Sequence, residues 1–265
     1  MDKNELSKIA RVRPDGTIVM HDEILCDGAD PHGFEVGKNI TCYSHIHDDH
    51  IKGLDDRLGA PHSEVYSTED TKKLASALFQ FDSEWINERT NYEGREFGKA
   101  HGKTVETNSK SFEISFLQAH HILGSAQILV RGNKNSVLYS SDFLLKGTVE
   151  HVEKNVDCLI LDATHGEHSE QQDFDEPKDA KIKVVKKVKE EVEKARDNGD
   201  PPRMNIQAHR GTMQLVMSWI REHVDPDTKF VTNRKDMNIA RIYSDYDHEC
   251  GDVDDEDHKL DKFFR

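Results

Sequence analysis

The sequence predicts an α+β fold in which β-sheets are covered by helices. The first half of the chain consists of short apolar strands separated by turns, and the second half alternates between helices and strands. In addition, four of the expected strands run directly into a His or Asp residue. We therefore expect reactive side chains to gather at one edge of the sheets, where the loops after these strands converge.

The strands expected in the first half are rich in Val, Ile, Phe and Tyr, and Gly, Asn or Asp residues bound several of them. They are Thr17–Met20, Glu23–Cys26, Ile40–Ser44, Glu64–Ser67, Ser111–Gln118, Ala126–Arg131, Ser136–Ser140 and Asp157–Asp162. A helix is expected over Thr71–Phe79, because a run of capping residues at 67–70 precedes it.

The second half has helical periodicity over Lys178–Arg196. The apolar residues on one face of this helix are Ile182, Val185, Val188 and Val192. The elements expected after it are a strand at Met204–Ala208, a helix at Thr212–His223, a strand at Lys229–Thr232 and a helix at Met237–Tyr246. Residues 247–265 hold eight acidic against three basic residues, so we expect a solvated, mobile tail.

The length of 265 residues fits one large domain or two small ones, and we expect one domain over residues 1–246. No run approaches the roughly 18 apolar residues of a membrane helix, and residues 1–5 contain no apolar signal region. A cytoplasmic protein without membrane contact is therefore expected. The four Cys residues form no Cys-x-x-Cys pair, which speaks against a structural zinc site or a disulfide framework.

The formal net charge of −15 opposes long-range attraction to nucleic acid, although a local basic patch could overcome it. One place for such a patch is the Lys-rich helix 178–196, but a run of this kind is more often a solvated helix surface. A halophilic host is another source of an acidic balance.

The most informative segment is Ser44–His50, with the sequence Ser-His-Ile-His-Asp-Asp-His. Imidazole and carboxylate groups are the ligands of zinc, manganese and iron. His45 and His47 lie on one side of an extended backbone, and Asp49 and His50 can turn inward from the loop that follows. The alternative is a polar loop with surface histidines, in a chain that has 16 of them. The order and spacing favour a site for one or two metal ions.

This segment closely resembles the signature of the metallo-β-lactamase superfamily. The family has a further His after a later strand, which matches His121, and a bridging Asp after another strand, which matches Asp142. The surrounding segments resemble the β-CASP branch of RNA- and DNA-processing nucleases, and Asp162 matches the acidic residue of that branch. The resemblance covers residues 40–166 and implies an αββα sandwich, with two sheets face to face and helices outside.

The chain departs from the family pattern at several positions. His120 and Ser141 stand where the family has Gly, and His165 replaces a Tyr. The large β-CASP insertion is reduced or absent, because only 46 residues, 163–208, separate Asp162 from His209. His209 then matches the first His after the insertion. In a rival alignment, residues 210–214 belong to the insertion itself and the returning segment is missing.

The resemblance implies a first metal position held by three His residues and a shared carboxylate. These ligands are His45, His47, His121 and Asp142. The second position would have Asp49, His50 and the same Asp142, with Asn233 near the place of the family's last His. We expect this position to be the weaker one. Zinc is the expected metal, with manganese or iron as alternatives.

The expected chemistry is hydrolysis by a metal-activated water, which Asp49 orients and deprotonates. His209, oriented by Asp162, is expected to protonate the leaving group. His165 and His168 are weaker ligand candidates. The function favoured is a nuclease acting on RNA or DNA. The alternatives are a hydrolase of a smaller substrate, such as a thioester, lactone or cyclic nucleotide, and a non-catalytic homologue. The sequence gives no signal for the oligomeric state.

Overall fold

The computed structural model describes residues 3–28, 40–60, 63–80, 91–107, 110–144, 153–163 and 177–244. Contacts within the chain cluster into two compact units, residues 1–163 and 164–265. The single domain expected over residues 1–246 stays a prediction. Among the described residues, no helix is both long and apolar enough to cross a membrane.

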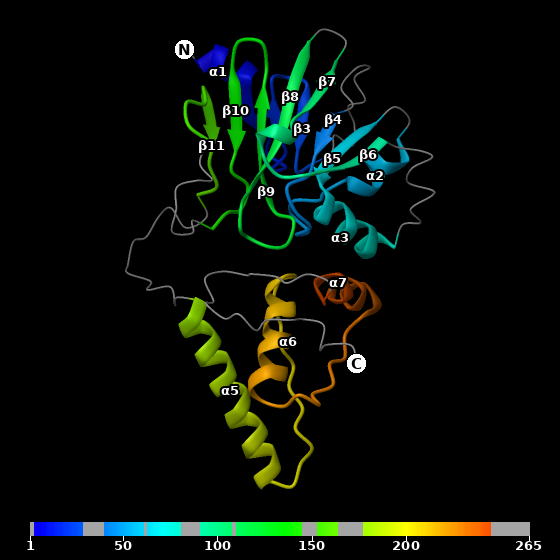
Figure 1. The fold of residues 1–265 in the computed structure, drawn as a ribbon, viewed down its shortest axis with the longest axis vertical. Coiled ribbons are helices and arrows are strands. Elements are labelled where there is room, and N and C mark those ends of the chain that lie inside the picture. The colour runs from blue at the N-terminus through cyan, green and yellow to red at the C-terminus, as the bar shows by residue number, and fades with distance from the viewer. Residues whose placement is uncertain are drawn as a thin grey trace. The chain divides into compact units, whose positions relative to one another are not determined.

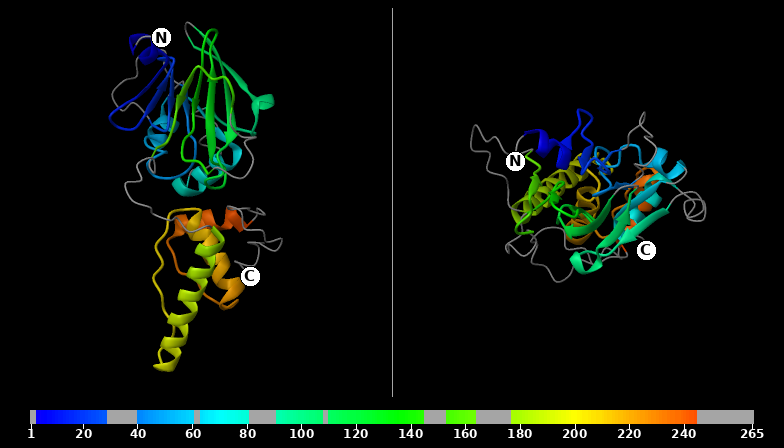
Figure 2. Two further views of the ribbon diagram at one scale, coloured as in Figure 1. Left: turned by 90° about the vertical axis from the view of Figure 1, so that its left-hand side faces the viewer. Right: turned by 90° about the horizontal axis from the view of Figure 1, so that it is seen from above.

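The first unit contains two sheets (Figures 1 and 2). The strands of the first sheet, in their spatial order, are β1 Ala10–Val12, β2 Ile18–Met20, β3 Ile24–Cys26, β4 Ile40–Cys42, β5 Glu64–Thr68 and β6 Asn91–Arg95. The strands from β1 to β3 pair antiparallel, and those from β3 to β6 pair parallel. Helices α2 Leu54–Gly59 and α3 Glu69–Phe79 lie in two of the parallel crossovers, as such connections require.

The second sheet is mostly antiparallel. Its strands in spatial order are β11 Cys158–Ile160, β10 Ser136–Tyr139, β9 Ala126–Arg131, β8 Ser111–Gln118 and β7 Lys103–Glu106. Only β10 and β11 pair parallel. Alternate residues of β8, namely Phe112, Ile114 and Phe116, join one core cluster with Met20 and Ile24 of the first sheet. The two sheets therefore pack face to face.

The predicted α+β class and two-sheet sandwich are confirmed. Helix α3 packs on β5 and β6, with Leu74, Ala75 and Leu78 buried. Its start is set by Thr68, whose hydroxyl accepts a hydrogen bond from the Thr71 N–H. The short elements α1 Lys3–Ile9, β1, α2, β6 and β7 were not expected from the sequence, because few of their residues repeat with a clear period.

The second unit is built from α5 Pro177–Asp197, α6 Thr212–His223 and α7 Arg234–Ser244. Its core holds Val188 of α5 against Val216, Trp219 and Ile220 of α6. The predicted face of α5 is wrong at Ile182, which is 55% exposed. Helix α7 begins three residues earlier than expected, because Asn233 caps it by accepting the Asp236 N–H.

The strands expected at residues 204–208 and 229–232 are wrong. Both segments lack β-pairing in the part of this unit that the structure describes, and Val231 is 96% exposed. Ile206 and Phe230 instead pack against the helical core. A strand needs a neighbour to pair its backbone groups, and the alternation of apolar residues does not reveal whether one is present.

Candidate metal centre

The first group of candidate ligands follows β4. Cys42, Ser44 and His45 have no exposed surface, so His45 is held in a buried position just beyond the end of the strand. The His47 carbonyl then accepts hydrogen bonds from the His50 and Ile51 N–H groups, at 2.9 and 3.1 Å. This tight turn brings His50 back toward His45, and their ring centroids lie 4.1 Å apart.

The loop after β8 carries His121 and is held at both ends. The Ser125 hydroxyl accepts the N–H groups of His121 and Ile122, at 2.9 and 3.1 Å. The hydroxyls of Thr68 and Thr71 donate to the Gly124 carbonyl, at 2.6 and 2.9 Å. The start of α3 therefore fixes the loop that presents His121.

Gly124→Ala is expected to destabilise the protein by about 2–4 kcal/mol, because the residue has φ +78° and an added Cβ would lie 2.6 Å from the Thr71 nitrogen. Gly199→Ala is the matched control, since Gly199 has φ +75° and an added Cβ there would meet nothing within 4 Å. It should cost only about 1 kcal/mol. Urea denaturation measures both, and equal losses would show that the contact with Thr71 is unimportant.

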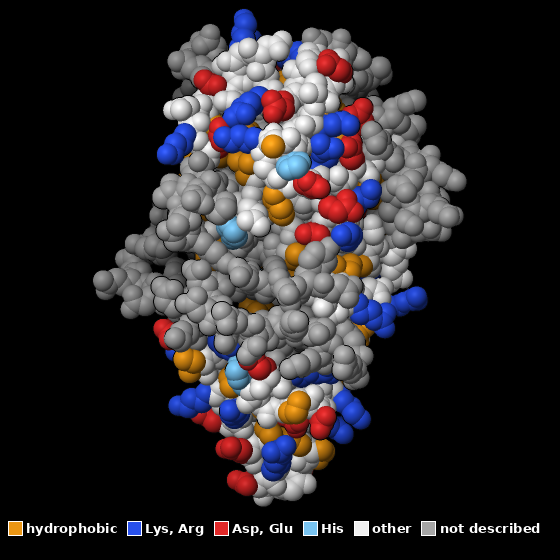
Figure 3. Space-filling view, viewed as in Figure 1, with side chains coloured by type: hydrophobic (Ala, Val, Ile, Leu, Met, Phe, Trp, Pro, Cys, Tyr) orange, Lys and Arg blue, Asp and Glu red, His pale blue; other side chains and the backbone are white. Residues whose placement is uncertain are grey.

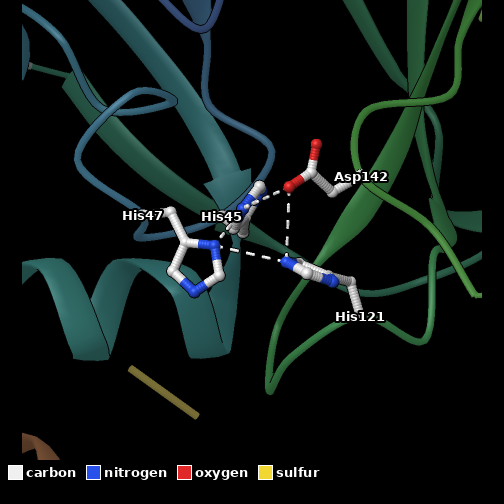
Figure 4. Close-up of side chains that lie close together, drawn as sticks. All are labelled: His45, His47, His121 and Asp142. Atoms are coloured by element: carbon white, nitrogen blue, oxygen red, sulfur yellow. Dashed lines mark hydrogen bonds and ion pairs between the residues drawn. The ribbon is translucent and has the colours of Figure 1, made fainter. Parts of the chain in front are cut away.

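Four side chains from three loops converge on one point (Figure 4). One nitrogen or oxygen from each of His45, His47, His121 and Asp142 lies within 4.8 Å of the other three. The Nδ1 of His47 is 3.0 Å from the Nε2 of His45 and 3.2 Å from the Nε2 of His121. The Oδ2 of Asp142 is 3.4 Å from the Nε2 of His121 and 3.8 Å from that of His45.

These spacings fit a zinc ion. Ligands about 2.0–2.1 Å from a tetrahedral metal are about 3.3 Å from one another. These four spacings in the cluster span 3.0–3.8 Å. If the three imidazole nitrogens all face inward with lone pairs, no hydrogen is left to form hydrogen bonds between them. A cation at the centre accepts all three lone pairs. The donor set therefore fits a divalent metal ion.

Burial and the neighbouring charges favour the protonation states in which these ligands coordinate a metal ion. Burial, followed by the neighbouring His50, His47 and His121, lowers the pKa of His45 far below its usual range. Burial and the neighbouring His47 also lower the pKa of His121. The hydrogen bond from His50 is the main cause that lowers the pKa of Asp142. Neutral imidazoles and an ionised carboxylate are the forms that coordinate metal.

A second position adjoins the first. The Nε2 of His50 lies 3.3 Å from the Oδ1 of Asp142 and 3.6 Å from the Oδ2 of Asp49. The two oxygens of Asp142 thus face different groups, Oδ2 toward His45 and His121 and Oδ1 toward His50. Asp142 therefore has the geometry of a carboxylate shared between two ions. Asp49 is 70% exposed and belongs to the open side of the site.

Asp27, directly after β3, is a site residue that the sequence reasoning missed. It is 3% exposed, and one carboxylate accepts four hydrogen bonds. The donors are the Ser44 N–H, the Ser44 hydroxyl, the His50 Nδ1 and the Tyr139 hydroxyl, at 2.7, 2.6, 2.7 and 3.0 Å. By holding the His50 Nδ1, Asp27 directs the Nε2 toward Asp142. The signal was available, because Asp27 is one more acidic residue at the end of a strand.

The other predicted site residues lie as follows. Asp162 donates its N–H to the Ser140 hydroxyl at 2.8 Å, and its charge raises the pKa of His121, so it lies near the cluster. His209 is exposed in the second unit, just before α6. Asn233 is committed to capping α7. His165 and His168 fall outside the described residues.

Two residues that replace family glycines keep the glycine conformation. His120 and Ser141 have φ values of 56° and 52°, in the left-handed region, and each directly precedes a ligand of the cluster. A residue with a Cβ costs about 1–2 kcal/mol there. The backbone at both positions is thus the one that Gly favours.

The stability of the metal-free protein is expected to be greatest near pH 6.5. His45 and His121 have lowered folded-state pKa values, so the unfolded chain, with pKa about 6.5, binds more protons as the pH falls below that value. Burial lowers the pKa of His50, but Asp142 and Asp27 outweigh it and raise the pKa to about 10. The stability from His50 is complete below pH 6.5 and is lost as the pH rises to about 10.

Urea denaturation across pH in the presence of chelator measures this profile. His50→Gln should remove the alkaline decline and leave the acid decline in place. An alkaline decline that persists in His50→Gln would show that another group causes it.

No family model matches the chain. The 5′ exonuclease Apollo of Rattus norvegicus is 27% identical over 128 residues, which are 46% of this chain and 22% of that protein. Apollo of Gallus gallus is 26% identical over 133 residues, 49% of this chain and 26% of that protein. The match thus spans about a quarter or less of the length of these relatives.

A different curated protein also matches. The RIO-type serine/threonine-protein kinase Rio2 of Methanocaldococcus jannaschii is 24% identical over 169 residues, 61% of each chain. Kinases hold Mg²⁺ through oxygen ligands, whereas three of the four groups gathered in this cluster are imidazoles. The donor set of this cluster therefore differs from the oxygen ligands by which kinases hold Mg²⁺.

Among solved structures, a metallo hydrolase of Ignicoccus hospitalis is 11% identical, and the match covers 46% of this chain and 54% of that chain with a TM-score of 0.32. Apollo is a β-CASP metallo-β-lactamase nuclease. It shares with this chain a stretch of sequence, and the His-x-His-x-Asp-His segment here leads to a cluster of three His and one Asp at the ends of strands in a two-sheet sandwich. The sequence match and the His and Asp cluster together support the metallo-β-lactamase superfamily.

Proposed function

We propose that this chain is a zinc-dependent hydrolase that cleaves phosphodiester bonds in RNA or DNA. The observation that carries the proposal is the shared carboxylate. Asp142 faces His45 and His121 with one oxygen and His50 with the other, and this arrangement supports two neighbouring ions. The similarity to Apollo, whose name is that of a 5′ exonuclease, supports a nucleic-acid substrate.

When bound, zinc would supply Lewis acidity and lower the pKa of a bound water toward 7. His45, His47, His121 and Asp142 would hold the first ion, and His50, Asp49 and Asp142 the second. Asp49, exposed at the open side and 3.6 Å from His50, is placed to accept a proton from the attacking water. The role of His209 as the proton donor to the leaving oxygen stays a prediction from the sequence. The second ion would bind more weakly, because only one imidazole belongs to its ligand set.

Activity on a smaller substrate is the second candidate, and charge favours it. The net charge is −15, and on the face shown in Figure 3 acidic and basic side chains alternate over the described residues without forming a broad basic area. Such a surface gives little long-range attraction to nucleic acid. A thioester, lactone or cyclic nucleotide would need no such attraction.

The test is a cleavage assay on 5′-labelled RNA, single-stranded DNA and duplex DNA with zinc or manganese, beside a thioester, a lactone and a cyclic nucleotide. We expect labelled nucleic acid to be cut by the native chain and left intact by His47→Ala. Turnover of a small substrate without cleavage of nucleic acid would favour the second candidate function, hydrolysis of a smaller substrate. No turnover of any substrate by metal-loaded protein would indicate a non-catalytic homologue.

A further inference from the structure

A cavity of about 750 Å³ lies within the second unit. Part of its wall is the apolar core between α5 and α6, including Val188 and Ile220. The two segments 202–206 and 228–232, which the sequence predicts as strands, also line it. A cavity of this volume with mostly apolar walls is typical of a binding site.

The first of these segments has unused backbone groups. Residues 201–209 contain no helix, turn or bend and are drawn as plain coil in Figure 1. Within the described part of the chain, residues 203–208 form no backbone hydrogen bond. A row of unpaired N–H and C=O groups is a template for the addition of a strand. Met204 and Val231, which are 43% and 96% exposed and line the cavity, offer apolar contacts to the side chains of such a strand.

The charged side chains that line the cavity leave positive charge available to a ligand. Each acidic side chain in the lining already has a cationic partner, at 2.9–3.7 Å; the pairs are Glu191–Lys187, Asp225–Arg196 and Asp236–Arg210. Arg203 and Lys229 also line the cavity, and neither has an ionic partner among the residues that the structure describes. The ligand that complements this lining is therefore apolar in part and carries negative charge.

We propose that this cavity binds an extended acidic peptide of a partner protein, which adds a strand beside residues 203–208. The main chain of the peptide pairs with the unused backbone groups, its apolar side chains enter the cavity, and its carboxylates reach Arg203 and Lys229. A small amphipathic anion would leave the backbone row unpaired. A second copy of this chain is repelled by the net charge of −15 that each copy carries.

The probe is a fluorescein-labelled peptide in which Val and Asp alternate, titrated with the full chain and followed by fluorescence anisotropy. Arg203→Glu and Lys229→Glu should each weaken its binding about tenfold or more, because like charges then face each other. Lys189→Glu is the matched control, since Lys189 is exposed on α5 and does not line the cavity, and it should leave the affinity unchanged. The same peptide N-methylated at every residue lacks main-chain donors and should bind about tenfold more weakly than its parent.

Four results would overturn the inference. The first is no binding of the peptide, and the second is binding that neither the charge reversals nor N-methylation weakens. The third is binding of dodecanoate without binding of the peptide, which would assign the cavity to a small amphipathic anion. The fourth is a dimer of the native chain in analytical ultracentrifugation that Val231→Asp dissociates, which would assign it to a second copy. Val231 is 96% exposed, so this variant should keep the melting temperature of the native chain.

Discussion

His121→Ala should leave the protein without a tightly bound metal ion and abolish the stabilisation that the metal provides. Removing one of the four converging groups leaves two imidazoles and one carboxylate, too few for a closed tetrahedral site. Free metal at 1,000 times its dissociation constant stabilises a protein by about 4 kcal/mol, or roughly 8–16 °C in melting temperature at this size. Thermal melting with zinc and with chelator should show this difference in the native chain and not in the variant.

His101→Ala is the matched control. His101 is a half-exposed histidine of the same unit, paired with Glu96 at 3.1 Å and not part of the cluster. Its replacement should change stability by no more than about 0.5 kcal/mol and leave the zinc-dependent shift intact. A zinc-dependent shift of full size in His121→Ala would mean that the metal binds elsewhere.

Asp27→Ala should cost about 3–5 kcal/mol of stability, the largest loss expected from a single substitution beneath the cluster. The carboxylate is 3% exposed, so its removal leaves His50, Ser44 and Tyr139 without their acceptor in a place that water does not fill readily. His50 would also lose its orientation. We therefore expect the zinc affinity of the second metal position to fall more than that of the first. Urea denaturation of the metal-free protein measures the first effect and zinc titration the second.

Two milder variants calibrate this loss. Asp27→Asn keeps the shape and removes the charge, and should fall between the native chain and Asp27→Ala. Tyr139→Phe removes only one of the four hydrogen bonds, at 3.0 Å, and should cost about 1 kcal/mol. An Asp27→Ala variant within 1 kcal/mol of the native chain would contradict the role assigned to this carboxylate.

The parts of the fold that sequence predicted best are those with a strong local pattern. Ser111–Gln118 and Ala126–Arg131 begin and end where expected, because the first alternates apolar core residues and the second is a nearly continuous buried apolar run. Helix α6 also has the expected limits, set by Gly211 before it and an apolar face along it. The failed strands at 204–208 and 229–232 have a similar local pattern, and what they lack is a neighbouring strand, which only the tertiary structure reveals.

The candidate site likewise contains residues that a local sequence pattern reveals and residues that it does not. His45, His47, His121 and Asp142 could be named from the sequence because each follows a strand, and strand ends that share an edge bring such residues together. Asp27 also follows a strand, but its four hydrogen bonds come from residues 17, 23 and 112 positions away and leave no local sign in the sequence. The left-handed backbone of Ser141 was hidden for a different reason, since a Ser gives no local sign of positive φ.

An anomalous difference map from zinc-soaked crystals, recorded at the zinc absorption edge, tests the central claim most directly. The account predicts a strong peak about 2.0–2.2 Å from the His45 Nε2, the His47 Nδ1, the His121 Nε2 and the Asp142 Oδ2. A second, weaker peak is expected between His50 and the other oxygen of Asp142. A map with no peak among these four atoms, or with its main peak elsewhere on the molecule, would contradict the assignment of this cluster as a metal centre.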